Sequence, residues 1–181
     1  TYKIKTNLSL ENCKVGSSIS CDGICLTVTK LMKNRLNYSF LVNVGEETIR
    51  RSNIINWKKN TIINIEKSLK MGDEISGHFV YGHIDTTTKL NQIKELKNSW
   101  EFEFNFSSFN KSSDFKKYIV AKGSVAINGI SLTVASVFQK YFVVSVIPHT
   151  FHNTNLIHLK ENDLVNIEFD PLARYIIDRY A

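Results

Sequence analysis

The chain has 181 residues, of which 43% are hydrophobic and 22% are charged, and its formal net charge at pH 7 is +6. This composition is that of a globular protein and excludes disordered and collagen-like chains. The longest nearly apolar run, residues 141–147, is too short to cross a bilayer as a helix, and the first residues lack the pattern of a signal peptide. We therefore expect a soluble, cytoplasmic protein that makes no membrane contact.

The three cysteines, Cys13, Cys21 and Cys25, are odd in number and confined to the first half of the chain. This usage fits reduced thiols in a cytosolic protein better than a disulfide framework. His78 and His83 are five residues apart on a predicted strand, so their side chains point to opposite faces, and no Cys or carboxylate cluster joins them. The sequence also has no P-loop, Rossmann or nucleophile-elbow pattern. We predict neither a metal nor a bound cofactor.

Short segments rich in β-branched and aromatic residues recur along the chain and are typical of strands. In chain order the predicted strands are residues 2–6, 38–44, 62–65, 100–106, 142–146 and 165–169, with a further strand-like stretch at 77–87. Asp22-Gly23 and Asn128-Gly129 lie between apolar flanks and predict two-residue hairpin turns.

Three short helices are predicted between or after these strands. The first covers residues 10–14, the second covers 114–121 with Ser113 as its cap and Gly123 as its terminator, and the third begins at Pro171 and runs through Tyr180. Many short strands with few helices predict a mainly β protein.

The sequence is internally duplicated. Segment 18–28 returns as segment 124–134, segment 40–44 returns as 142–146, and segment 63–66 returns as 165–168, in the same order. Repetition of a whole supersecondary plan indicates two similar units. We predict two tandem antiparallel barrels with hairpin connections, and we expect the functional site in the cleft between them.

The first predicted barrel is shorter than the second at its beginning. The stretch 77–87 precedes strand 100–106 in the second half, whereas the equivalent of that later strand in the first half, residues 2–6, already stands at the start of the chain. We therefore expect the first barrel to lack its opening strand. Because an open barrel edge exposes unpaired backbone groups, we also expect the sequence to be a fragment of a longer chain.

The two copies differ at polar positions that the repeat places in equivalent sites. The equivalent pairs are Cys25 and Ser131, Gly16 and Lys122, Glu47 and His149, and Ser68 and Asp170. Two pockets of similar shape with different polar linings are suited to hold two similar small molecules in different roles, such as donor and acceptor.

Several motifs in this order resemble those of the riboflavin synthase family. They occupy residues 23–29, 82–85, 122–134, 146–150 and 165–170, and the similarity covers nearly the whole chain. The resemblance implies two six-stranded Greek-key barrels, at residues 1–71 and 72–170, and a C-terminal helix that starts in residues 171–181 and joins three subunits into a homotrimer. It also implies a longer helix than the one present here.

The resemblance implies an activity that needs no external cofactor. Two molecules of 6,7-dimethyl-8-ribityllumazine exchange a four-carbon unit and give riboflavin and 5-amino-6-ribitylaminouracil. Each barrel would bind one lumazine, and the productive site would lie between the first barrel of one subunit and the second barrel of its neighbour.

The family pattern transfers to this chain position by position. Around the first ligand it implies Cys25, Leu26, Thr27, Asn43, Val44, Gly45, Glu46, Glu47 and Thr48. Around the second it implies Gly82, His83, Ile84, Lys122, Ser131, Leu132, Thr133, Val146, Ile147, Pro148, His149, Thr150 and Phe151.

Four of these positions, together with Asp170, are expected to act in the chemistry or beside it. Carbanion formation at a methyl group needs a tunable base and hydrogen-bonding partners around a flat heterocycle. We assign Ser131 and Thr133 to the reacting methyl, His83 to proton transfer and Cys25 to a polarising or nucleophilic contact at the acceptor. Asp170 is expected to reach the ring or the ribityl chain.

Two other functions remain as alternatives. Lumazine proteins resemble the synthases, bind one chromophore without turnover and are expected to lose polar site residues in one half. A basic barrel that binds single-stranded nucleic acid would stack bases on aromatic residues and use lysines along the backbone. The lysines here are not concentrated beside aromatic residues in the sequence, so we expect no nucleic-acid partner.

Overall fold

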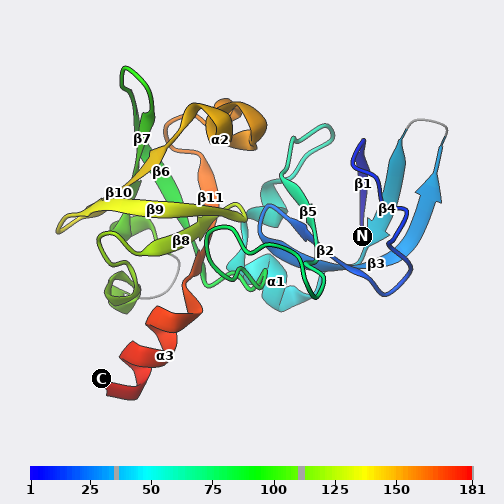
Figure 1. Ribbon diagram of the computed structural model, residues 1–181, viewed down its shortest axis with the longest axis horizontal. Coiled ribbons are helices and arrows are strands. Elements are labelled where there is room, and N and C mark those ends of the chain that lie inside the picture. Colours follow the sequence, from blue (N-terminus) through cyan, green and yellow to red (C-terminus); the bar gives the residue numbers. More distant parts are fainter. Residues whose placement is uncertain (35–36, 110–112, 181) are drawn as a thin grey trace.

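The structure is a computed structural model that describes residues 1–34, 37–109 and 113–180. The two halves of the duplicated sequence form two β lobes side by side, and the C-terminal helix projects from the second lobe (Figure 1). Residue 181, the last of the predicted segment 171–181, lies outside the described residues. No helix within the described part is long and apolar enough to cross a membrane.

The first half contains one open antiparallel sheet. Its strands are β1 (Tyr2–Thr6), β2 (Ser18–Cys21), β3 (Ile24–Lys33), β4 (Tyr38–Val42) and β5 (Ile65–Lys67). They lie in the order β1-β4-β3-β2-β5. The described residues of this half thus supply five strands, and the predicted strand at 62–65 is shifted toward the C-terminus.

The second half is a closed six-stranded barrel. Its strands are β6 (Thr86–Glu95), β7 (Trp100–Asn105), β8 (Ser124–Ile127), β9 (Ile130–Val137), β10 (Tyr141–Val146) and β11 (Leu164–Phe169). They lie in the order β10-β7-β6-β11-β8-β9. Because β10 pairs with β7 and β11 lies between β6 and β8, the connectivity is that of a Greek key. The mainly β architecture and the barrel are confirmed.

Equivalent residues of the repeat build the two cores. Phe40 and Val42 of β4 are fully buried in the first half, and Phe142 and Val144 of β10 are fully buried in the second. The strand register shifts by one residue at Thr29 in β3 and at Ala135 in β9, which are also equivalent positions. A matched bulge in both halves gives the two sheets the same local bend.

The short helices depart from the sequence prediction. Residues 10–14 form only a tight turn, in which Cys13 N–H donates to the Leu10 carbonyl oxygen (2.9 Å), because Leu10 is fully buried in the first core. The segment predicted at 114–121 is the 3-10 helix η3 (Ser113–Tyr118), which follows another short one, η2 (Phe106–Ser108). The predicted C-terminal helix is confirmed as α3 (Pro171–Tyr180).

Two helices lie where the sequence analysis expected only binding segments. They are α1 (Glu46–Arg51) and α2 (Pro148–Asn153), and each is followed by a 3-10 turn, η1 (Asn53–Asn56) and η4 (Asn155–His158). Six residues are too few to show a helical period, although Pro148 at the first helical position is a start signal. The stretch 77–87 is likewise not a strand until Thr86.

A hydrogen-bonded seam joins the two halves where their hairpin turns meet. Asp22 Oδ1 accepts from Asn64 N–H (2.7 Å), and the equivalent Asn128 Oδ1 accepts from Asn166 N–H (2.8 Å). Across the seam, the Asn64 side-chain amide donates to the Asn128 carbonyl oxygen (3.0 Å), and the Asn166 amide donates to the Asp22 carbonyl oxygen (2.9 Å). These four bonds form two equivalent pairs, so this part of the seam is pseudo-two-fold symmetric.

Two glycines allow the seam to close. Gly23 has φ +77° and Gly129 has φ +80°, values that favour glycine. A Cβ on Gly23 would lie 2.6 Å from the backbone nitrogen of Gly129, and a Cβ on Gly129 would lie 2.7 Å from that of Gly23. The two predicted hairpin turns therefore also form the closest approach of the two halves.

Candidate functional site

A groove with a volume of about 1390 Å³ is lined by residues of both halves. Strands β2, β3 and β5 of the first half contribute one wall, and residues 128–131 and the end of α2 contribute from the second half. Residues 74–82, which connect the two halves, also line it. The groove therefore combines equivalent surfaces of the duplicated units in one place.

The first-half wall carries a row of three polar side chains across neighbouring strands. Cys25 of β3 is directly opposite Ser20 of β2, and Ser20 is directly opposite Glu66 of β5. Directly paired residues share one face of a sheet, and all three line the groove. We call Cys25, Ser20 and Glu66 the first row.

The second half repeats this row at equivalent positions. Ser131 of β9 is opposite Ala126 of β8, and Ala126 is opposite Glu168 of β11. We call Ser131, Ala126 and Glu168 the second row. Ser131 lines the groove, whereas Glu168 is 2% exposed. The carboxylate of the second row is thus covered, whereas Glu66 of the first row is exposed.

The cover is the bridging segment, which we define as residues 77–85. His78 Nδ1 lies 2.7 Å from Ser131 Oγ, which is hydrogen-bond distance. Gly77 has φ +87°, and a Cβ there would overlap the Ser131 side chain. The start of the bridging segment therefore places an imidazole directly on the serine of the second row.

The end of the bridging segment is held by the carboxylate of the second row. Glu168 Oε1 accepts from Tyr81 N–H (2.7 Å), and Oε2 accepts from Gly82 N–H (2.8 Å) and His83 N–H (3.2 Å). Bonds from backbone N–H to an ionised carboxylate are among the stronger hydrogen bonds in proteins. Three consecutive amides are thereby fixed to β11.

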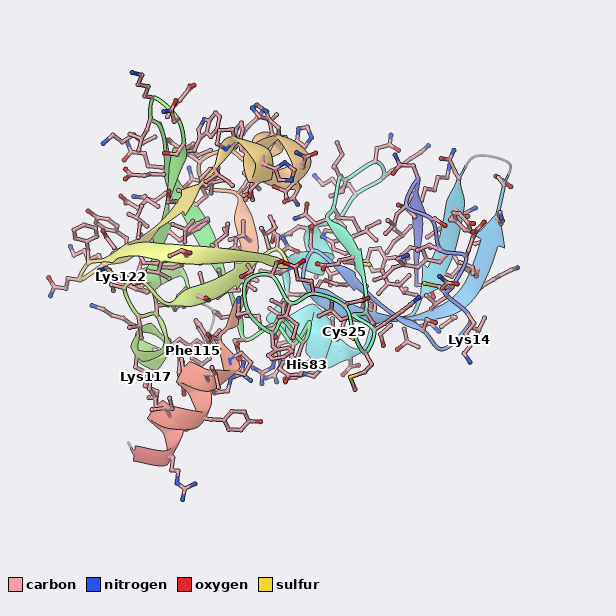
Figure 2. The ribbon with its side chains drawn as sticks, viewed as in Figure 1. Lys14, Cys25, His83, Phe115, Lys117 and Lys122 are labelled. Atoms are coloured by element: carbon pink, nitrogen blue, oxygen red, sulfur yellow. The ribbon has the colours of Figure 1, made fainter. Side chains whose placement is uncertain are left out.

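The bridging segment also contacts the first row. Gly82 has φ +79°, its carbonyl oxygen accepts from Cys25 N–H (2.8 Å), and a Cβ there would lie 2.6 Å from Cys25 Cβ. Ile84 packs in the core of the first half. Figure 2 shows Cys25 and His83 at the junction of the lobes, whereas Lys122 lies on the far side of the second lobe. A single residue, Gly82, thus connects the two rows.

Burial perturbs the titratable groups of this region in opposite directions. It lowers the pKa of His78, and the nearby Asp170 carboxylate only partly opposes that effect, so the neutral imidazole is favoured. Burial raises the pKa of Glu168, and the amides of Tyr81 and Gly82 reduce that rise. A neutral imidazole beside a serine hydroxyl is suited to accept a proton.

A second carboxylate, Asp85, anchors the start of α3 to the barrel. Asp85 Oδ2 accepts from Phe169 N–H (2.8 Å) and from Arg174 Nη2 (2.7 Å). Burial raises the pKa of Asp85, and the Arg174 and Arg51 guanidiniums act in the other direction. The helix α1, which carries Arg51, therefore lies close to the bridging segment, in agreement with Figure 1.

The predicted site residues on strands divide between the groove, the outer surface and the cores. Cys25, Gly82 and Ser131 line the groove. Thr27 and Thr133 are exposed, two residues along the same strand face as Cys25 and Ser131, and His83 is also exposed. The side chains of Leu26, Leu132, Val146 and Ile84 are buried in the cores.

The remaining predicted residues lie near the helices. Asn43, Val44 and Gly45 follow β4, while Glu46, Glu47 and Thr48 begin α1, where Glu47 pairs with Arg50 and Arg51. Ile147 precedes α2, which contains Pro148, His149, Thr150 and Phe151. Phe151 stacks on Trp100 (ring centroids 4.1 Å apart). Asp170 caps α3 by accepting from Leu172 N–H (2.9 Å).

The sequence analysis missed His78, Glu168 and residues 152–154 as parts of the site. His78 was considered only as a metal ligand, and within the described residues no group of three or more His, Cys, Asp or Glu could hold a metal ion. The sequence signal for Glu168 was present, because the repeat aligns it with Glu66. Its partners are 85 to 87 residues away in the sequence and leave no local pattern.

Comparison with known families identifies both halves of the chain. The sequence profile of the lumazine binding domain matches twice, at residues 1–68 and at residues 81–170. The two matches coincide with the two lobes and exclude most of the connection between them.

Known proteins with similar sequences share one name. The riboflavin synthase of Brucella abortus (strain 2308) is 38% identical over 174 residues, which cover 96% of this chain and 84% of that protein. The riboflavin synthase of Escherichia coli (strain K12) is 36% identical over 169 residues, which cover 93% of this chain and 76% of that protein.

Solved structures with a similar fold include crystal structures of LumP. The LumP complex with riboflavin has a TM-score of 0.75 and 17% identity and covers 92% of this chain and 87% of LumP. The complex with 6,7-dimethyl-8-(1'-D-ribityl) lumazine has a TM-score of 0.73 and 16% identity and covers 92% of this chain and 86% of LumP. This likeness shows the shared fold.

Proposed function

The chain belongs to the riboflavin synthase family and carries two lumazine binding domains, and on this basis we propose how its groove works. The function is that of a riboflavin synthase, a transferase that moves a four-carbon unit between two molecules of 6,7-dimethyl-8-ribityllumazine. The products are riboflavin and 5-amino-6-ribitylaminouracil. The observation that carries the proposal is the pair of equivalent rows, with Cys25 and Ser131 lining the same groove.

The size and lining of the groove support the binding of two ligands. Its volume of about 1390 Å³ exceeds the roughly 300–1,000 Å³ that is usual for a site holding one small molecule. Polar side chains from both rows and apolar ones, such as Ile65 and Ile130, line it. Flat heterocycles with hydroxylated chains need this mixture, because the ring favours apolar contacts and the chain needs hydrogen-bond partners.

We assign proton transfer to the second row. Proton abstraction from a methyl group leaves its electron pair on the ring, so the base must be unprotonated before the step, which for an imidazole is its neutral form, and close to the methyl carbon. His78 and Ser131 satisfy the first requirement and are hydrogen-bonded to each other. Asp170 stabilises the imidazolium that forms, and His83 and Thr133 complete the predicted set at the edge of the row.

We assign the acceptor lumazine to the first row. Cys25 is half-buried and faces the groove, and Ser20 and Glu66 lie beside it on the same sheet face. A thiol there can polarise or attack an electrophilic ring carbon. A groove built from two equivalent surfaces can hold the two lumazines in a fixed relative orientation. Such orientation removes several kcal/mol of the activation barrier.

We further propose that the subunits form a homotrimer in the cytoplasm. The support is the surface of α3, where Leu172, Tyr175 and Ile176 are all at least 60% exposed. Apolar side chains on one projecting helix favour association with other copies. We also propose residues 1–71 and 72–170 as the two barrel domains and the helix from Pro171 as the trimerisation element.

Conversion of 6,7-dimethyl-8-ribityllumazine to riboflavin tests the enzyme against a ligand carrier of the same fold. We expect flavin absorbance to rise with time when the purified protein is mixed with the lumazine, and to rise more slowly with Cys25→Ala. If the protein raised the fluorescence polarisation of the lumazine without forming flavin, the carrier would be the correct description and the catalytic roles would be wrong.

A further inference from the structure

The buried carboxylate of Glu168 binds the backbone of the bridging segment between the two rows. Glu168 accepts from Tyr81, Gly82 and His83, and Gly82 accepts from Cys25. Building on the proposed function, we infer that Glu168 is a positioning residue: it holds the Tyr81–His83 backbone so that Cys25 and His83 keep their places relative to Ser131. Glu168 itself does not face the groove, so it acts through the bridging segment.

The position of Glu168 makes its carboxylate well suited to this task. It lies on β11 between β6 and β8, and its backbone is paired with Ala126. The side chain is 2% exposed, and its bonds within the described residues are to backbone N–H groups. Burying a carboxylate without a cation costs free energy, and an apolar side chain would fill the space more cheaply. A carboxylate, unlike an apolar side chain, can accept hydrogen bonds from the three backbone N–H groups and hold them in place.

The connection to Cys25 runs through one peptide unit on each side of Gly82. The Gly82 N–H is bound to Glu168 Oε2 (2.8 Å), and the Gly82 carbonyl oxygen accepts from Cys25 N–H (2.8 Å). Gly82 also packs against the Cys25 side chain, because a Cβ on Gly82 would lie only 2.6 Å from Cys25 Cβ. Release of the carboxylate bonds would therefore move the backbone that covers the thiol and the backbone that carries His83.

The equivalent residue of the first row provides the contrast. Glu66 has the same strand position relative to Cys25 as Glu168 has to Ser131, yet Glu66 is exposed and lines the groove. The sheet therefore does not itself require a covered carboxylate at this position. The cover over Glu168 is a property of the bridging segment.

Glu168→Gln tests the inference, because the amide has nearly the same shape but replaces one acceptor oxygen with an NH₂ group that faces backbone N–H donors. We expect the amides of Tyr81, Gly82 and His83 to exchange hydrogen at least tenfold faster. Iodoacetamide should alkylate Cys25 at least threefold faster, with Cys13 as the internal reference. Turnover of the lumazine should fall at least tenfold.

Glu95→Gln, at the exposed end of β6, is the matched control and should change none of these rates. Unchanged exchange and unchanged Cys25 alkylation in Glu168→Gln would overturn the inference. If the wild-type protein formed no flavin, the proposed function would fail, while the exchange and alkylation measurements would still decide the role of Glu168.

A measurement on the wild-type protein keeps the inference testable if Glu168→Gln does not fold. As pH falls, protonation of the carboxyl removes its negative charge and turns one of its oxygens into an O–H donor, which weakens the hydrogen bonds from the three amides. Protection of Tyr81, Gly82 and His83, corrected for intrinsic exchange, should then fall before that of Val134 in β9. Loss of protection at the same pH for all four amides would contradict the inference.

Discussion

The first and second rows have the same sheet geometry but different environments. Cys25 and Ser131 both contact the bridging segment, but Glu168 is buried beneath that segment, whereas Glu66 is exposed in the groove. The duplication supplied two equivalent surfaces, and the connection between the halves distinguished them by covering the carboxylate of only one. This difference teaches that function in a duplicated fold can depend on the connecting segment as much as on the repeated units.

The same contrast extends to the seam. Asp22 and Asn128 occupy equivalent turns and make equivalent bonds to Asn64 and Asn166. Asp22, however, also accepts from the side chain of Asn155 (3.0 Å). The seam is thus nearly symmetric in hydrogen bonds but asymmetric in charge. The side-chain oxygens of Asp22 and Asn128 accept equivalent bonds, but only Asp22 can ionise.

The largest effect is expected from breaking the seam with Gly23→Ala. The new Cβ would meet the Gly129 backbone at 2.6 Å in a residue with φ +77°. We expect the free energy of unfolding to fall by about 3 kcal/mol, from left-handed strain and steric overlap together. Chemical denaturation of the wild-type protein and of Gly23→Ala measures this difference in the free energy of unfolding.

Gly72→Ala is the control for Gly23→Ala. Gly72 has φ +93°, but a Cβ there would have nothing within 4 Å. Its cost should be limited to backbone strain, about 1–2 kcal/mol. Equal costs for the two variants would contradict the close approach of the two turns.

The second prediction removes the charge asymmetry with Asp22→Asn. Burial raises the pKa of Asp22 from 3.8 to about 7 in the folded protein. The folded state therefore binds more protons than the unfolded state between these values, and stability is lost as pH rises from about 4 to about 7. We expect Asp22→Asn to flatten this dependence and to make the protein more stable at pH 8.

Thermal and chemical denaturation across pH 4–8 measure the effect of Asp22→Asn. Asn128→Asp is the reciprocal variant, which adds a second buried carboxyl at the seam and should steepen the loss. A wild-type stability that stays constant from pH 4 to pH 7 would show that Asp22 is not the group that titrates.

The third prediction concerns the covered row. Ser131→Ala removes the hydrogen bond to His78 Nδ1 (2.7 Å) and leaves the imidazole without its partner on β9. We expect kcat for flavin formation to fall about tenfold, equivalent to about 1.4 kcal/mol of activation free energy. Ser99→Ala, at the turn between β6 and β7, is the control and should leave kcat unchanged. A larger change in KM than in kcat would assign Ser131 to binding alone.

The sequence predicted the strands and turns of the two repeated units better than it predicted the short helices and the bridging segment. Matching segments predicted the strands around Phe40 and Phe142 and the turns at Gly23 and Gly129, because both depend on local residue types. The helices α1 and α2 were missed because six residues hold too little periodicity. Their start depends on how the chain leaves β4 and β10.

The candidate site was predicted in part. Cys25, Gly82 and Ser131 carried motif signals and line the groove. Glu168 and His78 did not stand out, because their roles depend on contacts with residues 53 to 87 positions away. A sequence pattern records which residues are present, but only the path of the bridging segment shows that His78 reaches Ser131.

The smallest effect is expected from Glu66→Gln, which sharpens the comparison of the two rows. Partial burial raises the pKa of Glu66, but its side chain is exposed in the groove. Replacing it should change the free energy of unfolding by less than about 0.5 kcal/mol, as for most surface substitutions. Glu168→Gln, which loses bonds to backbone amides, should cost about 1–3 kcal/mol in the same measurement. Equal costs for the two glutamates would mean that the bridging segment does not distinguish the rows, because the strand positions are otherwise equivalent.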